Sequence, residues 1–189
     1  VFSKVAKLPF EIYGGGTAKI NFSGPLDFSL LSYELNSKIL NGNIAKESFD
    51  ELDFVVTSKK GHVSFDNAVL KKSGGTITLT GTAEPTGQIQ TELIGRNFTL
   101  QSINSFAKTE LNINGDLNFN LTLTDHILSP KSLMTGTLTK SFISQESIPD
   151  SKFTMSFNKN TIEGSGKLMG DKVEAKFVIP LNENAPFSI

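Results

Sequence analysis

The sequence predicts an all-β fold built from antiparallel strands, and three observations support this. Apolar and polar residues alternate with period two through much of the chain, as in strands with one buried and one solvated face. Glycine and asparagine turn signals recur roughly every 8–15 residues, a spacing that suits hairpins and leaves little room for crossover helices. Only one short stretch, about 100–107, has helical spacing, with Thr99 as a possible N-cap.

The strands are predicted from the parity of their apolar residues. The clearest runs from Leu117 to Leu123, where every second residue is apolar and the residues between are Asn or Thr. Around Leu26–Leu35 the parity slips by one residue, which predicts a β-bulge in a long, bent strand. The same alternation predicts strands at Leu52, Phe54 and Val56; Val63 and Phe65; Ile77 and Leu79; Phe153, Met155 and Phe157; and Val173, Ala175, Phe177 and Ile179.

Turns are expected between these runs, because hairpin connections favour residues that tolerate positive φ angles. Lysine pairs such as Lys59-Lys60 and Lys71-Lys72 flank two of them, where charge also protects strand edges from aggregation. The predicted turns are Gly14–Gly16, Gly24-Pro25, Asn41-Gly42, Lys60-Gly61, Gly74-Gly75, Pro85–Gly87, Asn114-Gly115, Lys159-Asn160 and Gly170-Asp171.

Composition narrows the class of protein. Of 189 residues, 38% are apolar and 20% charged, so the chain has enough apolar material to fold. The net charge is −1 and Arg96 is the only arginine, which argues against a nucleic-acid surface. With no cysteine, disulfides and thiolate metal sites are excluded. No apolar stretch is long enough for a membrane-spanning helix, and because the first residue is Val1, we expect a segment of a longer or processed protein.

A weak internal repeat is visible at an offset of about 99 residues. It places Gly16 on Gly115 and aligns further apolar positions, such as Ile20 with Phe119 and Phe54 with Phe153. The chain is therefore predicted to be one segment, 1–189, that contains two repeats, about 1–100 and 101–189. Stacked repeats of this kind complete each other's apolar face, so a longer array is expected.

No constellation of side chains predicts catalysis. His62 and His126 are far apart in the sequence, and Asp50, Glu51 and Asp53 fit a solvated strand residue and a turn better than a metal site. Gly14–Gly16 lacks the residues of a phosphate-binding loop. We expect no enzyme activity, no catalytic or metal-binding residue and no cofactor.

Three passages, which together cover about half of the chain, share a pattern in which alternating strands begin or end at glycine. They are Leu40–Ile44 leading through Phe49–Phe54 and Gly61–Phe65 to Leu70–Gly81; Asn97–Phe106; and Leu111–Leu123. These passages resemble the repeats of the TamB/AsmA-like superfamily of bacterial envelope proteins. The resemblance implies a U-shaped β-taco, a curved and mostly antiparallel sheet with an apolar groove, at most one short helix, and no catalytic residues. Pro85 and Pro149 interrupt what would otherwise be continuous strands of this groove.

The resemblance also implies a function. The segment would lie in the periplasm of a Gram-negative bacterium, in a parent protein anchored in the inner membrane, and would guide phospholipid acyl chains between the inner and outer membranes. The chain has fifteen Phe, two Tyr and no Trp, so almost all of its aromatic side chains lack a polar group, as suits the lining of an apolar groove. The residues expected to line the groove are Phe54, Val56, Val63, Phe65, Ile77, Leu79, Phe119, Leu121, Leu123, Phe153 and Phe157.

Two alternatives remain open at the level of sequence. One is a module for outer-membrane protein assembly that works with an outer-membrane barrel partner like TamA. The other is a structural β-repeat of a surface protein, in which the same apolar residues form a closed core. The alternation pattern taken alone favours such a closed core, and it is the resemblance that favours the open groove.

Overall fold

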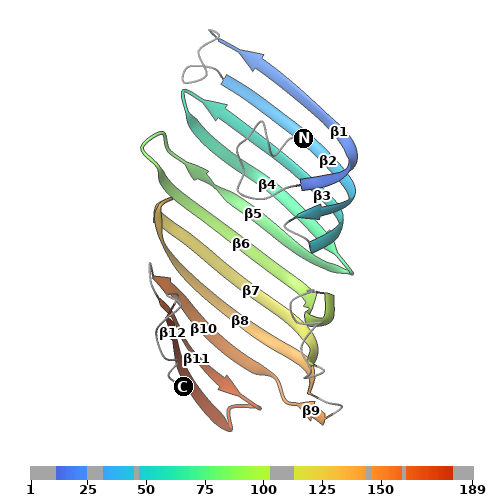
Figure 1. Cartoon of the computed structure of the whole chain (residues 1–189), viewed down its shortest axis with the longest axis vertical. Helices are drawn as coiled ribbons and strands as arrows, with labels where there is room; N and C mark the ends of the chain where they lie inside the picture. The colour runs from blue at the N-terminus through green and yellow to red at the C-terminus, as the bar shows by residue number, and fades with distance from the viewer. Residues whose placement is uncertain are drawn as a thin grey trace.

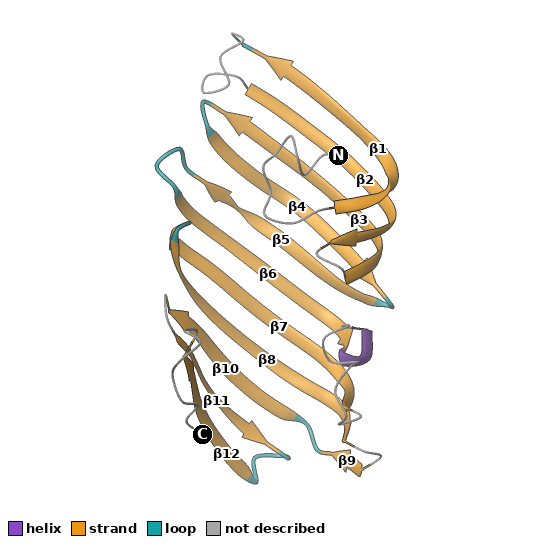
Figure 2. Ribbon diagram, viewed as in Figure 1, coloured by secondary structure: helices purple, strands orange, loops and turns teal. Residues whose placement is uncertain are grey.

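The computed structural model describes residues 12–24, 32–44, 47–102, 113–143, 146–158 and 161–180, and these residues form one 12-stranded sheet in which every pairing is antiparallel. Eleven strands follow the order β1-β2-β3-β4-β5-β6-β7-β8-β10-β11-β12, and β9 pairs with β8 off this path. The predicted fold class is confirmed: the sheet is curved, almost free of helix, and shaped like a U (Figures 1 and 2).

Apart from β9, the strands lie in the sheet in the same order as in the sequence. The strands are β1 Ile12–Ser23, β2 Ser32–Ile44, β3 Glu47–Lys59, β4 His62–Lys72, β5 Gly75–Ala83, β6 Gln88–Thr99, β7 Ile113–His126, β8 Ser129–Ile143, β9 Glu146–Ile148, β10 Ser151–Asn158, β11 Thr161–Leu168 and β12 Val173–Pro180. One 3-10 turn, η1 Leu100–Ser102, stands at the start of the predicted helix, and the rest of that prediction, like the predicted bulge between Leu30 and Leu31, lies outside the described residues.

The sheet is a single layer. Within the part of the chain that the structure describes, each strand makes its extensive contacts with its neighbours in the sheet, and no second sheet packs on either face. β1 and β12 are the two edges, and they are not paired with each other.

Several predicted turns are confirmed, and three are wrong. Lys60-Gly61, Pro85–Gly87 and Gly170-Asp171 connect strands as expected. In contrast, Gly14–Gly16 lies inside β1, Asn41-Gly42 inside β2 and Asn114-Gly115 inside β7. The physical reason is that a positive φ angle serves a kink within a strand as well as a hairpin turn.

These kinks are β-bulges, and they bend the strands near one margin of the sheet. Asn41, Asn97 and Lys140 have φ angles of 49°, 51° and 50°, and the pairing of β1 with β2, β6 with β7 and β7 with β8 is interrupted beside them. A bulge adds one residue to one strand of a pair and sharpens the local bend and twist. The strand ends at this margin curl over, most clearly in β1 to β3 (Figure 1).

The strand boundaries repeat at the offset found in the sequence. β2 ends at Ile44 and β8 at Ile143, while β4 begins at His62 and β11 at Thr161, each pair 99 residues apart. The left-handed residues Asn41 and Lys140 are also 99 residues apart. The division into two repeats, about 1–100 and 101–189, stays a prediction, but the strands and one bulge share its period.

Phenylalanine rings lie across glycines of the neighbouring strand. Phe119 is paired with Gly95 and Phe153 with Gly136, and a Cβ atom on either glycine would collide with the paired ring. The same relation holds for Phe177 with Gly164 and for Phe49 with Gly42. The missing side chain lets each ring lie down on the sheet, so the rings cover the backbone without standing far above it.

We predict that Gly95→Ala and Gly136→Ala destabilise the protein. The added methyl group must displace the ring of Phe119 or Phe153, and overpacking of this kind costs about 1–3 kcal/mol. Urea unfolding followed by circular dichroism measures the loss. Gly15→Ala is the matched control, because no atom lies within 4 Å of a Cβ at Gly15. Equal stability of all three variants would contradict the ring-over-glycine packing.

Candidate functional site

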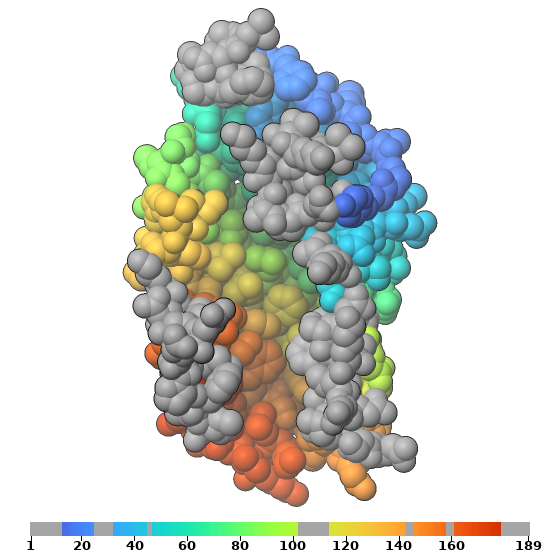
Figure 3. Space-filling view, viewed as in Figure 1, coloured from blue at the N-terminus to red at the C-terminus, as the bar shows by residue number. Residues whose placement is uncertain are grey.

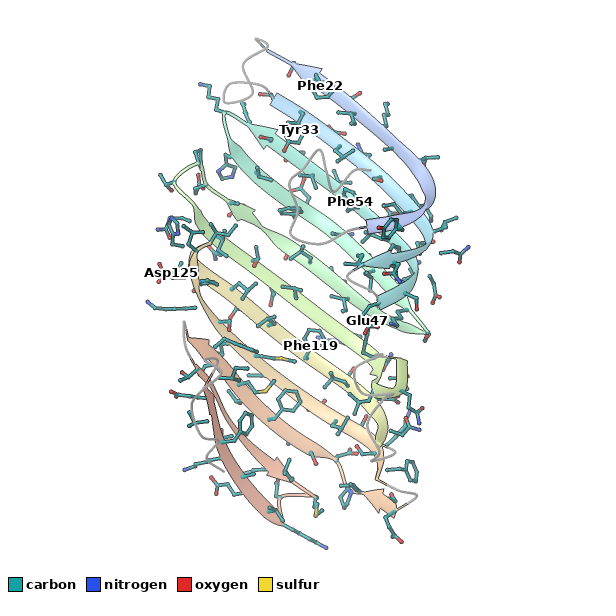
Figure 4. All side chains as sticks on the ribbon, in the orientation of Figure 1. Phe22, Tyr33, Glu47, Phe54, Phe119 and Asp125 are labelled. Atoms are coloured by element: carbon teal, nitrogen blue, oxygen red, sulfur yellow. The ribbon has the colours of Figure 1, made fainter. Side chains whose placement is uncertain are left out.

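The register of the strands places all eleven residues predicted to line a groove on one face of the sheet. Phe54 and Phe119 lie on the face turned towards the viewer in Figure 4. Because every pairing is antiparallel and the register is restored after each bulge, the side chains of paired residues continue across neighbouring strands on the same side. We call this side the inner face.

The inner face consists of continuous rows of side chains that run across the strands. Three rows cross most of the sheet, and their members, all paired in register or adjacent to a bulge, are as follows. The first row is Leu35, Val56, Phe65, Gly81, Thr91, Leu123, Ser132, Phe157 and Ile162; the second is Ser37, Phe54, Ala68, Leu79, Leu93, Leu121, Met134, Met155, Gly164 and Phe177; the third is Ile39, Leu52, Leu70, Ile77, Gly95, Phe119, Gly136, Phe153, Gly166 and Ala175.

The inner face is half-buried. Of the eleven predicted residues, only Val56 is buried, at 8% exposure, and the other ten are of intermediate exposure. In a closed sandwich core, side chains such as Phe119 and Leu121 would be almost fully buried. Instead these side chains keep part of their surface exposed, and the part of this face that is visible in the space-filling view is hollowed into a shallow trough (Figure 3).

The trough is long enough for several lipid tails. Eleven strands in path order, spaced by about 4.8 Å, span roughly 48 Å along the rows. An extended acyl chain occupies about half of the ~30 Å hydrocarbon core of a bilayer, so roughly 15 Å. A chain lying along a row would cover about three to four strands.

Sequence reasoning missed a charged pair at the margin of the trough. The Lys72 Nζ donates to Glu47 Oε2 over 2.7 Å, and the Lys72 side chain is only 7% exposed. Lys72 follows Leu70 with the parity of the inner face and pairs with Gly75. The lysine pair Lys71-Lys72 was expected only to flank a turn, but the two side chains separate onto opposite faces. This margin also buries Phe49, Phe98 and Leu100, at 3%, 6% and 6% exposure.

The opposite face, which we call the outer face, is mainly polar. Glu51 pairs there with Lys38 of β2 and Lys71 of β4, each at 2.9 Å. Asp53 is an exposed strand residue, as predicted, whereas Asp50 and Glu51, which were expected in a turn, also lie inside β3. The hydrogen bond from Lys71, and then that from Lys38, lowers the pKa of Glu51 below its ordinary value.

Shallow hollows on the outer face do not form a binding site of evident chemistry. Three hollows of about 250, 430 and 350 Å³ share Thr154 in their lining. Their other side chains are mostly Thr, Ser, Asn and Lys, which is an ordinary solvated strand surface.

The two histidines do not come together as ligands. His62 Nδ1 lies 2.8 Å from Glu84 Oε1, and His126 Nδ1 accepts a hydrogen bond from the Leu128 amide at 3.2 Å. Over the described ranges, no group of three or more His, Cys, Asp or Glu side chains could hold a metal ion. Nor does any helix in those ranges have the length and apolarity to cross a membrane.

Comparison of this chain with protein-family models, with curated proteins and with solved structures found no match in any of the three. The argument for function therefore rests on the geometry of the inner face.

We predict that Glu51 stabilises the folded protein in a pH-dependent way. Because its pKa is lowered in the folded state, its contribution is complete above the ordinary carboxylate pKa and is lost as the pH falls through the folded value. Glu51→Gln should lower the urea midpoint at neutral pH, and the difference from the parent should vanish in strong acid.

Glu163→Gln is the control for this prediction. Glu163 is exposed on β11, and the structure records no ion pair for it among the described residues. A Glu51→Gln effect that is the same at all pH values would contradict the assignment to the Lys71-Glu51-Lys38 cluster.

Proposed function

We propose that this chain is a periplasmic lipid-binding and transfer segment, and that the trough on its inner face holds phospholipid acyl chains as they pass between the inner and outer membranes. The observation that supports this most strongly is the set of mainly apolar rows on a face that no second sheet of described residues covers. The role of Phe119, Leu121 and their neighbours would be passive solvation, without a reaction.

The energetics favour an elongated apolar ligand. Burying a CH₂ group contributes about 0.8 kcal/mol, so a sixteen-carbon chain would gain on the order of ten kcal/mol before ordering costs. The half-buried side chains of the trough gain as well, because an occupant removes their remaining area from water. The rows offer no charged group in their middle that would oppose such a chain.

The resemblance to the TamB/AsmA-like superfamily supports the same proposal and adds its setting: a parent protein anchored in the inner membrane and an outer-membrane barrel partner. A module for outer-membrane protein assembly would use the same surface for extended peptide. A structural repeat with a closed core is less well supported, because the inner face is half-buried.

We predict that the chain, produced in a bacterial periplasm, co-purifies with phospholipid. An open apolar trough would be filled by the most abundant apolar ligand that it meets. Native mass spectrometry, followed by organic extraction, detects the bound lipid and identifies it. A lipid-free monomer that also fails to take up added phospholipid would contradict the proposal.

We predict that Leu121→Asp blocks lipid binding without unfolding the protein. Leu121 lies in the middle of the trough and is only half-buried, so a carboxylate there would be solvated in the empty protein but would repel an acyl chain. Displacement of the fluorescent fatty acid cis-parinaric acid measures binding, and circular dichroism measures folding.

Thr122→Asp is the matched control, since it places the same charge one residue away on the exposed outer face. Folded Leu121→Asp that no longer binds, beside Thr122→Asp that does, supports the trough. An unfolded Leu121→Asp would mean a closed core, and a folded one that still binds would place the ligand elsewhere.

A further inference from the structure

The β7–β8 hairpin ends in two apolar side chains that project from the rim of the sheet. Ile127 is 58% exposed and Leu128 is 84% exposed, the largest value for a bulky apolar side chain among the described residues. They form the two-residue turn between His126 and Ser129, which are paired. This hairpin tip stands beside Asp125, which Figure 4 labels at the edge of the sheet.

The composition of this tip is unusual for a turn. Other described turns of the chain contain glycine, as in Lys60-Gly61, Ser73-Gly74 and Gly170-Asp171. Ile127 and Leu128 have no positive φ angle, and neither has a side chain that could hydrogen-bond within the turn. The turn therefore lacks the residues that turns prefer, at the point where its side chains are most exposed. Such a departure from local sequence preference is a feature of functional positions.

Hydrogen bonds to neighbouring residues of the rim fix the backbone of the tip. The Ile127 amide donates to the Gly87 carbonyl of the neighbouring turn at 2.8 Å, and the Leu128 amide donates to His126 Nδ1 at 3.2 Å. Lys131 pairs with Asp125 at 2.9 Å beside them. The two apolar side chains are thus presented from a fixed backbone.

The rim that carries the tip also carries two lysines, Lys59 and Lys60, for which the structure records no ion pair among the described residues. The hairpin turns β3–β4, β5–β6 and β7–β8 lie on the same rim, since alternate turns of an antiparallel sheet share a side (Figure 1). Described residues of these turns and their flanks include three lysines, Lys59, Lys60 and Lys131, against two carboxylates, Glu84 and Asp125. Glu84 lies 2.8 Å from His62 and Asp125 lies 2.9 Å from Lys131, so Lys59 and Lys60 are the lysines of these turns that no recorded carboxylate pairs with.

The size and charge of this surface favour a lipid bilayer as its partner. A stable protein interface buries about 800 Å² on each side, which two side chains on a protruding turn do not provide. A bilayer surface accepts single apolar side chains between its headgroups, and anionic lipids attract lysines on the same rim, here Lys59 and Lys60. We propose that Ile127 and Leu128 insert into the surface of a bilayer that contains anionic lipid and dock this rim of the sheet on it.

Docking of the rim is separate from acyl-chain binding in the trough. Ile127 and Leu128 lie beyond the end of the inner-face rows, outside the residues proposed to solvate the lipid tails. The two proposals can therefore fail independently, and Leu121→Asp should leave docking unchanged.

The experiment is flotation of the full chain with vesicles of phosphatidylcholine that contain phosphatidylglycerol, compared with vesicles of phosphatidylcholine alone. The parent chain should float with the anionic vesicles. The double variant Ile127→Ser, Leu128→Asn should bind the anionic vesicles at least about tenfold more weakly than the parent chain, because binding strength follows the apolar area inserted. Ser and Asn suit a turn, so the hairpin is expected to stay folded.

Met169→Asn is the matched control. Met169 is 44% exposed in the β11–β12 turn on the opposite rim, and its φ angle of 55° suits asparagine. This variant should float like the parent chain. A parent that does not float, a double variant that floats equally well, or equal loss in Met169→Asn would overturn the proposal; self-association that the double variant abolishes without any flotation would assign the tip to a second copy of the chain.

Discussion

The antiparallel register between neighbouring strands is the constraint on which the rest of this structure depends. Side chains alternate with a period of two, so a slip of one residue in a single ladder would carry every residue beyond it to the other face. In the β6–β7 ladder, for example, such a slip would put Asn120 in the place of Leu121, opposite Leu93. The inner rows exist because the register holds across successive ladders and is restored after each bulge.

A single-layered sheet leaves part of its hydrophobic free energy unused. Complete burial of a Leu or Phe side chain contributes about 1.5–3 kcal/mol, and a half-buried side chain obtains only part of it. The Phe119-Gly95 and Phe153-Gly136 pairs recover some of the burial by laying rings on the neighbouring backbone. An occupant of the trough would supply the rest, so the same property that limits the stability of the empty chain would favour ligand binding.

The sequence predicts which side chains share a face but does not predict whether that face is open. Parity alone was enough to place Phe54, Phe119 and Phe153 together, because a period of two is a local property of any strand. Exposure depends on what lies opposite, and local pattern carries no information about a missing second layer. The misreading of Asn41-Gly42 and Asn114-Gly115 has a similar cause, since one backbone conformation serves both hairpin turns and bulges.

The Lys72-Glu47 pair and the exact tip of the β7–β8 hairpin were not predicted. Lys71 and Lys72 were placed together beside a turn, whereas β4 extends through Lys72, so the two side chains point to opposite faces as successive strand residues do. Asp125 and His126 indicate a turn at this point of the sequence, but the position of Ile127 and Leu128 at its tip depends on the pairing of His126 with Ser129.

Strand direction sets a rule for how such a sheet can be extended. Eleven strands in path order, all antiparallel to their neighbours, make β1 and β12 run in the same direction. Direct pairing of the β12 edge of one unit with the β1 edge of another would be parallel, whereas an intervening strand antiparallel to both keeps the ladder uniform. Strands β5 and β12 are counterparts, because their positions in the sequence differ by nearly the same 99-residue offset as those of the other strands. After β5 the chain adds β6, which is antiparallel to both β5 and β7, and β6 is therefore an example of such an intervening strand. A repeat that adds an even number of strands, as β1 to β6 does, is therefore the unit that keeps both strand direction and the apolar rows in phase along a longer array.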